Sequence, residues 1–467
     1  MSLNSNINKL KSILNSNNVL TKLEERYCYA TDALNSDIEF KVPDLVVFVE
    51  SIEEVQQIMK FANKHKIPVI SRGAGTNMVG SCVCKSGGII LNFSKMNKIL
   101  EINTDNMIVK VQPGVILGDL KNAVEKEDLF YPPDPSNFKV STIGGSIAQS
   151  SGGALAFKYG TTKNYVLSLK VVNASGELIT LGSETTKDAT GYHLAQLMVG
   201  SEGTLGIIVE ATLKLIPKPQ SRRVISAYFK TIDNAMHFVN NIIKSNISPA
   251  AIDFMDKNSI STVENFAHIG LKTEYQCLII IELDGLESSM EEQINIVNNV
   301  LIKNSADYIS ISNSNTDSNK IWEARRLSFA AATKLAPDVL SDDFIVPREN
   351  LIKMINKCTE ISTKYNLSLC LVGHIGDGNL HPQFVLNLED PVEQTKYKKA
   401  KEELYETVQS LNGKISAEHG IGIEKLSFLK NTIDSNNLMY MRLIKRIFDP
   451  NNILNPGKIF DIEDIKE

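Results

Sequence analysis

Two short motifs hold the side chains of this sequence that are best suited to chemistry. His374 and His381 open and close the segment His-Ile-Gly-Asp-Gly-Asn-Leu-His, and Glu418 and His419 are neighbours in Glu-His-Gly-Ile-Gly. Imidazole nitrogens and carboxylate oxygens bind divalent metal ions, and three such protein ligands leave a position for a substrate oxygen. The two histidines do not have the i, i+4 spacing of a helical zinc site, so a strand and its following loop are expected to carry them.

Glu418 and His419 are expected to have different roles. In an extended chain neighbouring side chains point to opposite faces, so one can bind metal while the other faces a substrate proton. A single histidine is more often a partly buried structural residue, but two such motifs in one chain favour a site. The other histidines lack such neighbours and are interpreted as structural: His65, His193, His237 and His268.

Arg325 and Arg326 follow Trp322 in a segment that is expected to be helical. Arginine suits bidentate binding of a carboxylate because its guanidinium presents a planar fork of donors. From this segment alone, solvent-exposed charges remain the simpler interpretation.

A stretch of small residues, 142–154, is expected to position a ligand for these groups. Two glycine pairs bracket it, and glycine allows a backbone to come close to a bulky ligand. We expect this backbone to lie against a large flat cofactor; a flexible loop is the alternative.

The turn Arg72-Gly73-Ala74-Gly75-Thr76-Asn77 follows a short predicted strand, 67–71. Its backbone N–H groups can form a concave site for a pyrophosphate, although a plain turn is the more common explanation of Gly-x-Gly. Met78 stands where the dinucleotide fingerprint needs a third glycine, so NAD on a Rossmann domain is not the first choice.

The remaining chain mixes strands and helices without strict alternation, which predicts an α+β fold. A helical segment is expected over 1–40, a first domain over 41–219, a second α+β domain over 220–440 and a turn-rich tail over 441–467 that returns to the first domain. The helix is expected from the spacing of Leu10, Ile13, Leu14, Leu20 and Leu23, and the strands 166–172 and 178–181 are expected to form a hairpin. Pro217-Lys218-Pro219 marks the boundary between the two domains, and Ser51 and Glu54 form a capping-box pattern before a helix.

Composition excludes several classes of protein. A formal charge of −5 offers no basic surface for nucleic acid. The six cysteines are scattered, without paired CxxC motifs, so an iron–sulfur cluster or a structural zinc is not expected. No secretory signal and no apolar run of about 18 residues is found, which predicts a cytoplasmic protein without a membrane span.

Taken together, these motifs resemble the FAD domain of the vanillyl-alcohol-oxidase/p-cresol-methylhydroxylase superfamily, and the histidine motifs resemble the cap domain of its D-2-hydroxyacid dehydrogenase branch. That branch includes D-lactate and D-2-hydroxyglutarate dehydrogenases and one subunit of glycolate oxidase. The resemblance covers about 40 to 460 and implies a two-part PCMH-type FAD-binding domain, an α+β cap domain and a tail that returns to the FAD domain. The motifs that carry it are 72–76, 133–136, 144–153, 200–206, 374–381, 418–422 and 455–458.

The resemblance also implies roles for single residues. His374, His381 and Glu418 would bind a divalent metal such as Zn, Fe or Mn, His419 would take the substrate hydroxyl proton while hydride passes to flavin N5, and Arg325 would hold the substrate carboxylate. FAD is expected to be non-covalent because the phosphate turn has no histidine or cysteine, although Cys82 and Cys84 lie just beyond it. The residues implied to contact FAD are Arg72, Gly73, Ala74, Gly75, Thr76, Asn77, Gly80, Pro133, Asp134, Ser136, Thr142, Gly144, Gly145, Ala148, Gly152, Gly153, Tyr159, Gly160, Val166, Glu202, Gly203, Gly206, Ile207 and Asn455.

The segment 340–347 bears on the substrate. Hydroxyglutarate enzymes of the branch that the chain resembles carry a lysine here for the distal carboxylate, whereas this segment has none. Asp342 and Asp343 would repel a second carboxylate, so a small monocarboxylate is favoured, first D-lactate, which would be oxidised to pyruvate. A D-2-hydroxyglutarate or glycolate dehydrogenase is the alternative within the superfamily, and a non-catalytic FAD-carrying electron-transfer subunit is the alternative of another class. Electrons would pass to an external acceptor, for which electron-transfer flavoprotein subunits, in a system that can be bifurcating, are the candidate.

Overall fold

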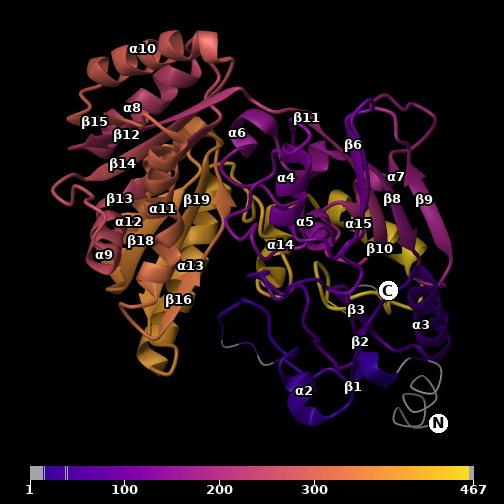
Figure 1. Ribbon diagram of the computed structural model, residues 1–467. Coiled ribbons are helices and arrows are strands. Elements are labelled where there is room, and N and C mark those ends of the chain that lie inside the picture. Colours follow the sequence, from indigo (N-terminus) through magenta and orange to yellow (C-terminus); the bar gives the residue numbers. More distant parts are fainter. Residues whose placement is uncertain (1–13, 15, 37, 39, 462–467) are drawn as a thin grey trace.

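The computed structural model describes residues 14, 16–36, 38 and 40–461, which form two parts side by side (Figure 1). We call them the two-sheet part, built mainly from 40–217, and the large-sheet part, built from 221–410. The mixture of helices and antiparallel and parallel strands confirms the predicted α+β class. Among the described residues no helix is long and apolar enough to cross a membrane.

The first sheet of the two-sheet part has the order β1-β2-β4-β3, and its last three strands are parallel. Ser51 caps the helix that follows it, since its Oγ accepts from Glu54 N at 3.2 Å. Only half of the predicted capping box is present, because Glu54 Oε2 accepts from Glu50 N at 2.8 Å instead of from Ser51 N. The strands of this first sheet and the helices between them are η1 (Ser16–Asn18), β1 (Val19–Leu20), α2 (Leu23–Tyr27), β2 (Leu45–Phe48), α3 (Ile52–His65), β3 (Val69–Arg72) and β4 (Ile89–Asn92).

The helix expected over 1–40 is mostly absent from the part that is described. Only α2 is α-helical there, and Val19 and Leu20 pair instead with Val47 and Val46 of β2. Edge pairing satisfies the backbone of β1 and overrides the helix that the spacing of Leu20 and Leu23 predicts. The expected helical residues Leu10 and Ile13 lie outside the described residues.

The second sheet is antiparallel, with the order β5-β6-β10-β8-β9, and the predicted hairpin at 166–181 is its β8–β9 edge. Short helices, among them α4, α5 and α6, lie between this sheet and the large-sheet part (Figure 1). The elements are β5 (Ile99–Asn103), β6 (Ile108–Val111), α4 (Leu117–Glu125), β7 (Leu129–Phe130), α5 (Ile143–Gln149), α6 (Ala156–Tyr159), η2 (Thr162–Asn164), β8 (Val166–Val172), β9 (Leu178–Gly182), α7 (Leu194–Met198), β10 (Ile207–Lys214) and β11 (Ile216–Pro217).

The large-sheet part is an antiparallel sheet, β15-β12-β14-β13-β18-β19-β16, to which β17 adds through β19. Alternate residues of its strands bury into two cores, one shared with α8, α10, α12 and α13 and the other with α9 and α11. The elements are β12 (Ser221–Phe229), α8 (Ile232–Ile243), β13 (Ala251–Asp256), α9 (Lys257–Ala267), β14 (Cys277–Gly285), α10 (Glu287–Lys303), β15 (Tyr308–Ile311), α11 (Asn315–Ala332), β16 (Asp338–Ser341), β17 (Phe344–Ile345), η3 (Arg348–Asn350), α12 (Leu351–Tyr365), β18 (Ser368–Gly373), β19 (Asn379–Leu386) and α13 (Pro391–Ser410).

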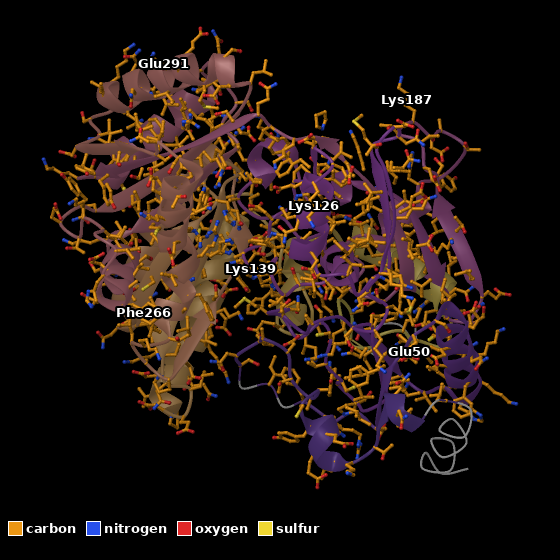
Figure 2. All side chains as sticks on the ribbon, in the orientation of Figure 1. Glu50, Lys126, Lys139, Lys187, Phe266 and Glu291 are labelled. Carbon is orange, nitrogen blue, oxygen red and sulfur yellow. The ribbon has the colours of Figure 1, made fainter. Side chains whose placement is uncertain are left out.

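The C-terminal segment returns to the two-sheet part, as predicted. After α13 the chain runs through α14 (Leu426–Thr432) and α15 (Ser435–Phe448), and Leu454 forms a parallel bridge with Val69. The return begins before α14, because Ile423 N donates to Val79 O at 2.8 Å. Side chains of both parts project into the region between them (Figure 2).

Candidate active site

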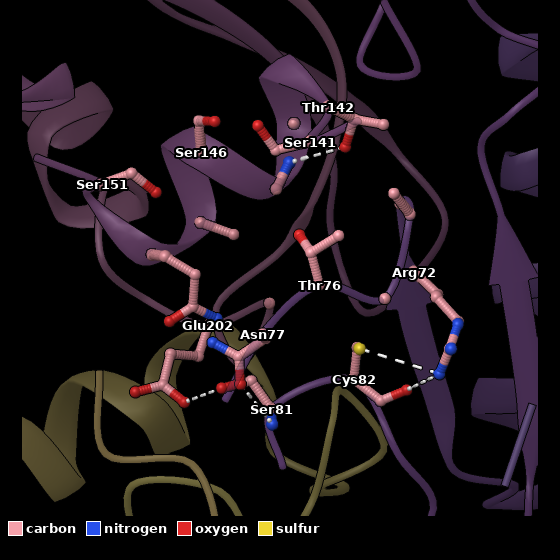
Figure 3. A pocket seen from close by; sticks show the side chains of 18 of the residues that line it. Arg72, Thr76, Asn77, Ser81, Cys82, Ser141, Thr142, Ser146, Ser151 and Glu202 are labelled. Atoms are coloured by element: carbon pink, nitrogen blue, oxygen red, sulfur yellow. Dashed lines mark hydrogen bonds between the residues drawn. The ribbon is translucent and has the colours of Figure 1, made fainter. Parts of the chain in front are cut away.

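Two adjoining cavities lie where the parts meet. The first is lined mainly by the two-sheet part, through the turn after β3, helix α5 and residues of the segment 201–208 (Figure 3). The second is lined by both parts, and Arg325 and His374 face it from the large-sheet part. Glu418 and His419 line both cavities, so the loop that carries them lies at the junction.

The first cavity has the features of a site for a large polar ligand. Three buried side-chain atoms that line it have no hydrogen-bond partner among the described residues: Ser141 Oγ, Ser146 Oγ and Gln149 Oε1. A Cβ added to Gly145 would meet only Thr142 Oγ1, at 3.1 Å, so that position opens into the cavity. Buried polar atoms are normally satisfied, so these groups fit a bound cofactor with polar edges.

The structure brings most of the predicted FAD contacts to this cavity. Those that line it are Arg72, Gly73, Ala74, Gly75, Thr76, Asn77, Ser136, Thr142, Gly144, Gly145, Ala148, Glu202, Gly203 and Gly206. Those that do not line it are Gly80, Pro133, Asp134, Gly152, Gly153, Tyr159, Gly160, Val166, Ile207 and Asn455.

Several residues of the second group support the site from outside. Asp134 lines the second cavity, and Gly152 N donates to Glu418 Oε2 at 3.1 Å. The Tyr159 hydroxyl donates to Asp284 Oδ2 at 2.6 Å, which ties the two parts together. Asn455 Nδ2 donates to Ser81 O at 2.7 Å and to Glu202 O at 2.6 Å.

The three predicted metal ligands converge from separate elements. His374 follows β18, His381 lies in β19 and Glu418 lies in the loop between α13 and α14. Glu418 Oε1 is 3.7 Å from His374 Nε2 and 3.5 Å from His381 Nε2. Two ligands that each lie 2.1 Å from a tetrahedral ion are about 3.4 Å apart, so both distances from Glu418 suit ligands of one divalent metal.

Asp253 of β13, which the sequence reasoning missed, holds two of the predicted site residues. Its Oδ1 is 2.7 Å from His374 Nδ1, and its Oδ2 is 2.8 Å from Arg325 Nε. Burial raises the pKa of Asp253, but His374 and Arg325 outweigh that effect and the net shift is downward. Burial lowers the pKa of His374, and its pairing with Asp253 and Glu418 outweighs this and raises the pKa to about 10.

Asp343 was also missed as a site residue. Its Oδ2 accepts from the backbone N–H groups of Ala417, Glu418 and His419 at 2.9, 3.0 and 2.9 Å, and from Ser416 Oγ at 2.9 Å. Ligand atoms of Asp343, His381, Glu418 and His419 lie within 4.8 Å of one another, a grouping that could hold an ion and that does not include His374. Because four donors occupy Oδ2 and Asn379 Nδ2 donates to Oδ1 at 2.9 Å, we favour an orienting role for Asp343 and retain His374 as the ligand.

The expected repulsion of a second carboxylate by Asp342 and Asp343 is wrong. Both side chains are buried, and neither lines the second cavity. Asp342 accepts from the Tyr405 hydroxyl and lies 3.8 Å from Lys425 Nζ, while Asp343 binds backbone donors. Because these partners compensate both carboxylates, the segment does not distinguish mono- from dicarboxylic substrates.

His419 and Arg325, the two predicted catalytic residues, face the same space. The His419 ring stacks on that of His381, with centroids 5.3 Å apart and planes inclined by 21°. Arg325 projects from α11, and Trp322 lies one turn earlier on the same helix. A proton acceptor and a carboxylate-binding group therefore meet beside the predicted metal ligands.

Comparisons with known proteins show the family of the chain. Residues 218–459 match the family model "FAD linked oxidases, C-terminal domain", and residues 43–182 match the model "FAD binding domain". The chain is 39% identical to glycolate oxidase subunit GlcD of Bacillus subtilis over 419 residues, covering 90% of this chain and 89% of the relative.

Two further relatives and one solved structure extend the comparison. D-lactate dehydrogenase of Anaerostipes hadrus is 34% identical over 89% of each chain, and D-2-hydroxyglutarate dehydrogenase of Stutzerimonas stutzeri is 30% identical over 97% of this chain and 98% of the relative. The structure of p-cresol methylhydroxylase with substrate bound has a TM-score of 0.82 at 18% identity, and the match covers 98% of this chain and 97% of that chain. At this identity the similarity shows a shared fold.

Proposed function

Because this chain belongs to the FAD-linked oxidases, we propose that it oxidises a small D-2-hydroxyacid, with D-lactate as the first candidate. The observation that carries this proposal is the position of Glu418 and His419 at the junction of the cofactor cavity and a second cavity that Arg325 lines. FAD, when bound, supplies the acceptor for the hydride that leaves the substrate Cα.

The chain's own residues would bind, orient and deprotonate the substrate. Arg325 binds the carboxylate, and Asp253 fixes the guanidinium that does so. His419 accepts the hydroxyl proton as the carbon–oxygen double bond forms. The backbone of His419 is held by Asp343 and by Asn77 Nδ2, which donates to its carbonyl at 3.1 Å, so the base is fixed before substrate arrives.

A divalent metal would be held by His374, His381 and Glu418. The Nδ1–Asp253 contact fixes the direction of the His374 ring, as carboxylates commonly do for metal-binding histidines. A metal there would supply polarisation of the substrate hydroxyl oxygen. Zn, Fe and Mn all suit a ligand set of two imidazoles and a carboxylate.

A D-2-hydroxyglutarate dehydrogenase is the second candidate. Lys121 and Arg326 line the second cavity besides Arg325, and these cations suit a distal carboxylate. Glycolate remains a third substrate to compare. A non-catalytic electron-transfer subunit is less favoured, because a base, a carboxylate-binding arginine and a metal-type ligand set converge in one cavity.

The decisive experiment is anaerobic bleaching of the bound flavin. D-lactate, L-lactate, glycolate and D-2-hydroxyglutarate are each added to FAD-loaded protein, with and without a chelator. We expect D-lactate to bleach the flavin fastest, the chelator to slow this reaction and added metal to restore it. Failure of all four acids to reduce metal-loaded protein contradicts the proposal, and fastest reduction by D-2-hydroxyglutarate selects the second candidate.

We also propose that the electrons leave to an external acceptor, with electron-transfer flavoprotein subunits as the candidate. The sequence lacks a cluster motif and a Rossmann fingerprint that would give this chain a second redox site. Reduction of the partner flavin by substrate through this protein would support the proposal. Direct reduction of a quinone at the full rate of flavin reduction would contradict it.

A further inference from the structure

The loop 416–422 has every backbone N–H group from Ala417 to Gly422 bound to an oxygen of a side chain. Asp343 takes the first three, Ser416 Oγ accepts from Gly420 N at 2.9 Å, and Glu202 takes the last two. Asp343 belongs to the large-sheet part, whereas Glu202 belongs to the two-sheet part. The loop that carries Glu418 and His419 is therefore held by Asp343 of the large-sheet part at its start and by Glu202 of the two-sheet part at its end.

Glu202 lines the cofactor cavity, yet its carboxylate binds protein groups. Its Oε1 accepts from Ile421 N at 2.7 Å, and its Oε2 accepts from Gly422 N at 2.8 Å and from Ser81 Oγ at 2.7 Å. The sequence reasoning assigned Glu202 to FAD contact. The carboxylate instead points towards the catalytic loop, beside Asn77 and Ser81 (Figure 3).

The backbone of Glu202 has a conformation that favours glycine. Its φ is +53°, and the φ angles of Gly200 and Gly203 are +77° and +71°. A non-glycine residue in the left-handed region costs about 1 kcal/mol or more, and such strain concentrates at functional sites. The carboxylate of Glu202 makes three hydrogen bonds to the protein that a glycine at this position could not supply.

The loop also fits closely against other residues of the cofactor cavity. A Cβ on Gly420 would lie 2.5 Å from Gln149 Oε1 and 2.8 Å from Glu202 Oε1, so only glycine permits this approach. Asn77, which lines the same cavity, donates to His419 O. Asn77 and Glu202 thus line the cofactor cavity and also bind loop 416–422.

We propose that Glu202 is a positioning residue that couples FAD occupancy to the order of loop 416–422, and through it to the placement of Glu418 and His419. A ligand in the first cavity restrains the turn 200–203, and the two hydrogen bonds from Ile421 and Gly422 transmit that restraint to the loop. By linkage, an ordered loop also strengthens FAD binding. The kinetic part of this inference rests on the proposed function, whereas the coupling itself does not.

The coupling can be measured by hydrogen–deuterium exchange in the full-length chain, stripped of FAD and then reloaded. In the wild-type protein FAD should slow amide exchange in the peptide that spans 416–424. Glu202→Gln keeps the size of the side chain but replaces one of the two accepting oxygens with an amide NH₂ group. Because that group cannot accept from Ile421 N or Gly422 N, the FAD-dependent slowing of exchange should shrink by about tenfold. FAD absorbance at saturation shows that the variant is loaded.

Flavin reduction gives a second readout. Glu202→Gln should lower the limiting rate of anaerobic flavin reduction by roughly tenfold, because a small displacement of a catalytic group has that effect. The half-saturating substrate concentration should change little, since Arg325 is untouched. Glu202→Asp, which keeps the charge, should recover part of the rate.

Asp256→Asn is the matched control. Asp256 Oδ1 accepts from the backbone N–H groups of Ser259 and Leu371 at 2.8 and 3.1 Å, and this residue lines neither cavity. It should preserve the FAD-dependent slowing at 416–424. Ser81→Ala removes one donor to Glu202 and gives a milder test if Glu202→Gln does not fold.

Equal FAD-dependent slowing in wild type and in both Glu202→Gln and Ser81→Ala overturns the proposal, as does loss of the slowing in Asp256→Asn to the same extent. If no hydroxyacid reduces the wild-type flavin, the proposed function fails while the exchange result still decides the coupling. The two failures are therefore distinguishable.

Discussion

Asp253 is a single buried carboxylate that serves two side chains with different roles. His374 and Arg325 each contact one of its oxygens, so loss of the charge affects the predicted metal site and the predicted carboxylate site together. Buried charges left without a partner cost several kcal/mol, which makes such a bridge sensitive to conservative change.

Asp253→Asn should therefore lower metal affinity by about tenfold or more and also raise the KM for the hydroxyacid. Metal content after dialysis and steady-state kinetics measure the two effects. Asp307→Asn, which alters a half-buried carboxylate paired with Lys230 away from both cavities, is the control. A change in KM without a change in metal content would contradict the dual role.

The carboxyl of Asp134 predicts a pH effect on stability. Burial raises its pKa from 3.8 to about 7, although Lys121 opposes the shift. Between these two values the folded chain keeps a proton that the unfolded chain has lost, so the free energy of unfolding falls as pH rises and levels off above about pH 7.

Asp134→Asn removes this titration, so its stability relative to wild type should increase as the pH rises from about 4 to about 7. Urea unfolding of FAD-loaded protein at several pH values measures the difference. Asp119→Asn, on the exposed face of α4, serves as the control. A constant difference across this range would mean that Asp134 does not carry the effect.

The residue types of the site were predictable only where they form motifs. His374, His381, Glu418 and His419 stand out because several reactive groups and glycines cluster in short segments. Asp253 has no such neighbours, and the only signal in the sequence is an acidic residue inside an apolar strand segment. Long-range pairing decides its role, and a single sequence does not contain that information.

At the scale of elements, the small-residue stretch 142–154 forms α5 and the turn that follows it. Thr142 caps the helix, since its Oγ1 accepts from Gly145 N at 3.3 Å. Gly144 and Gly145 are adjacent, but they face different surroundings. A Cβ on Gly144 would lie 2.6 Å from Pro113 Cβ, whereas Gly145 opens into the cofactor cavity.

This contrast gives a matched pair of variants. Gly145→Val should fold and lose FAD occupancy, because the added side chain enters the cavity. Gly144→Ala should instead lower the free energy of unfolding by about 1–3 kcal/mol through overpacking against Pro113. Flavin absorbance per chain and urea unfolding separate the two outcomes. Full FAD occupancy in Gly145→Val would show that the cofactor does not lie against this helix.

Elements were predicted best where the apolar pattern is strong and local. The strand that precedes His374 and the β8–β9 hairpin are confirmed. The pairing of β1 with β2 could not be predicted, because it depends on a partner strand about 25 residues away in the chain. Glu202 was assigned by motif to the cofactor, and the direction of its side chain became visible only in three dimensions.

At the scale of the whole molecule, the C-terminal tail completes the cofactor cavity from behind. Asn455 Nδ2 bridges the carbonyls of Ser81 and Glu202, and Lys445 Nζ donates to Thr204 O at 2.8 Å and to Leu454 O at 2.9 Å. The contacts to Ser81, Glu202 and Thr204 join the tail to turns that lie 374, 253 and 241 residues earlier in the chain.

Asn455→Ala should lower the free energy of unfolding by about 1–3 kcal/mol, because two buried carbonyl groups lose their donor. It should also weaken FAD binding, since both carbonyls belong to cavity-lining residues. Thermal unfolding and FAD titration measure these effects. Asn451→Ala, which removes an exposed hydrogen bond to Asn63, is the control and should change stability little.

The hydrogen bonds of loop 416–422 limit how the two-sheet part and the large-sheet part can move relative to each other. Swinging the large-sheet part away as a lid would pull on the bonds from Glu202 to Ile421 and Gly422, from Asn77 to His419 and from Gly152 to Glu418. Opening of the molecule by this movement is unfavourable, because it would break four hydrogen bonds at the catalytic centre. We therefore expect substrate to enter and product to leave through a permanent opening, while the two-sheet part and the large-sheet part keep their relative positions during turnover.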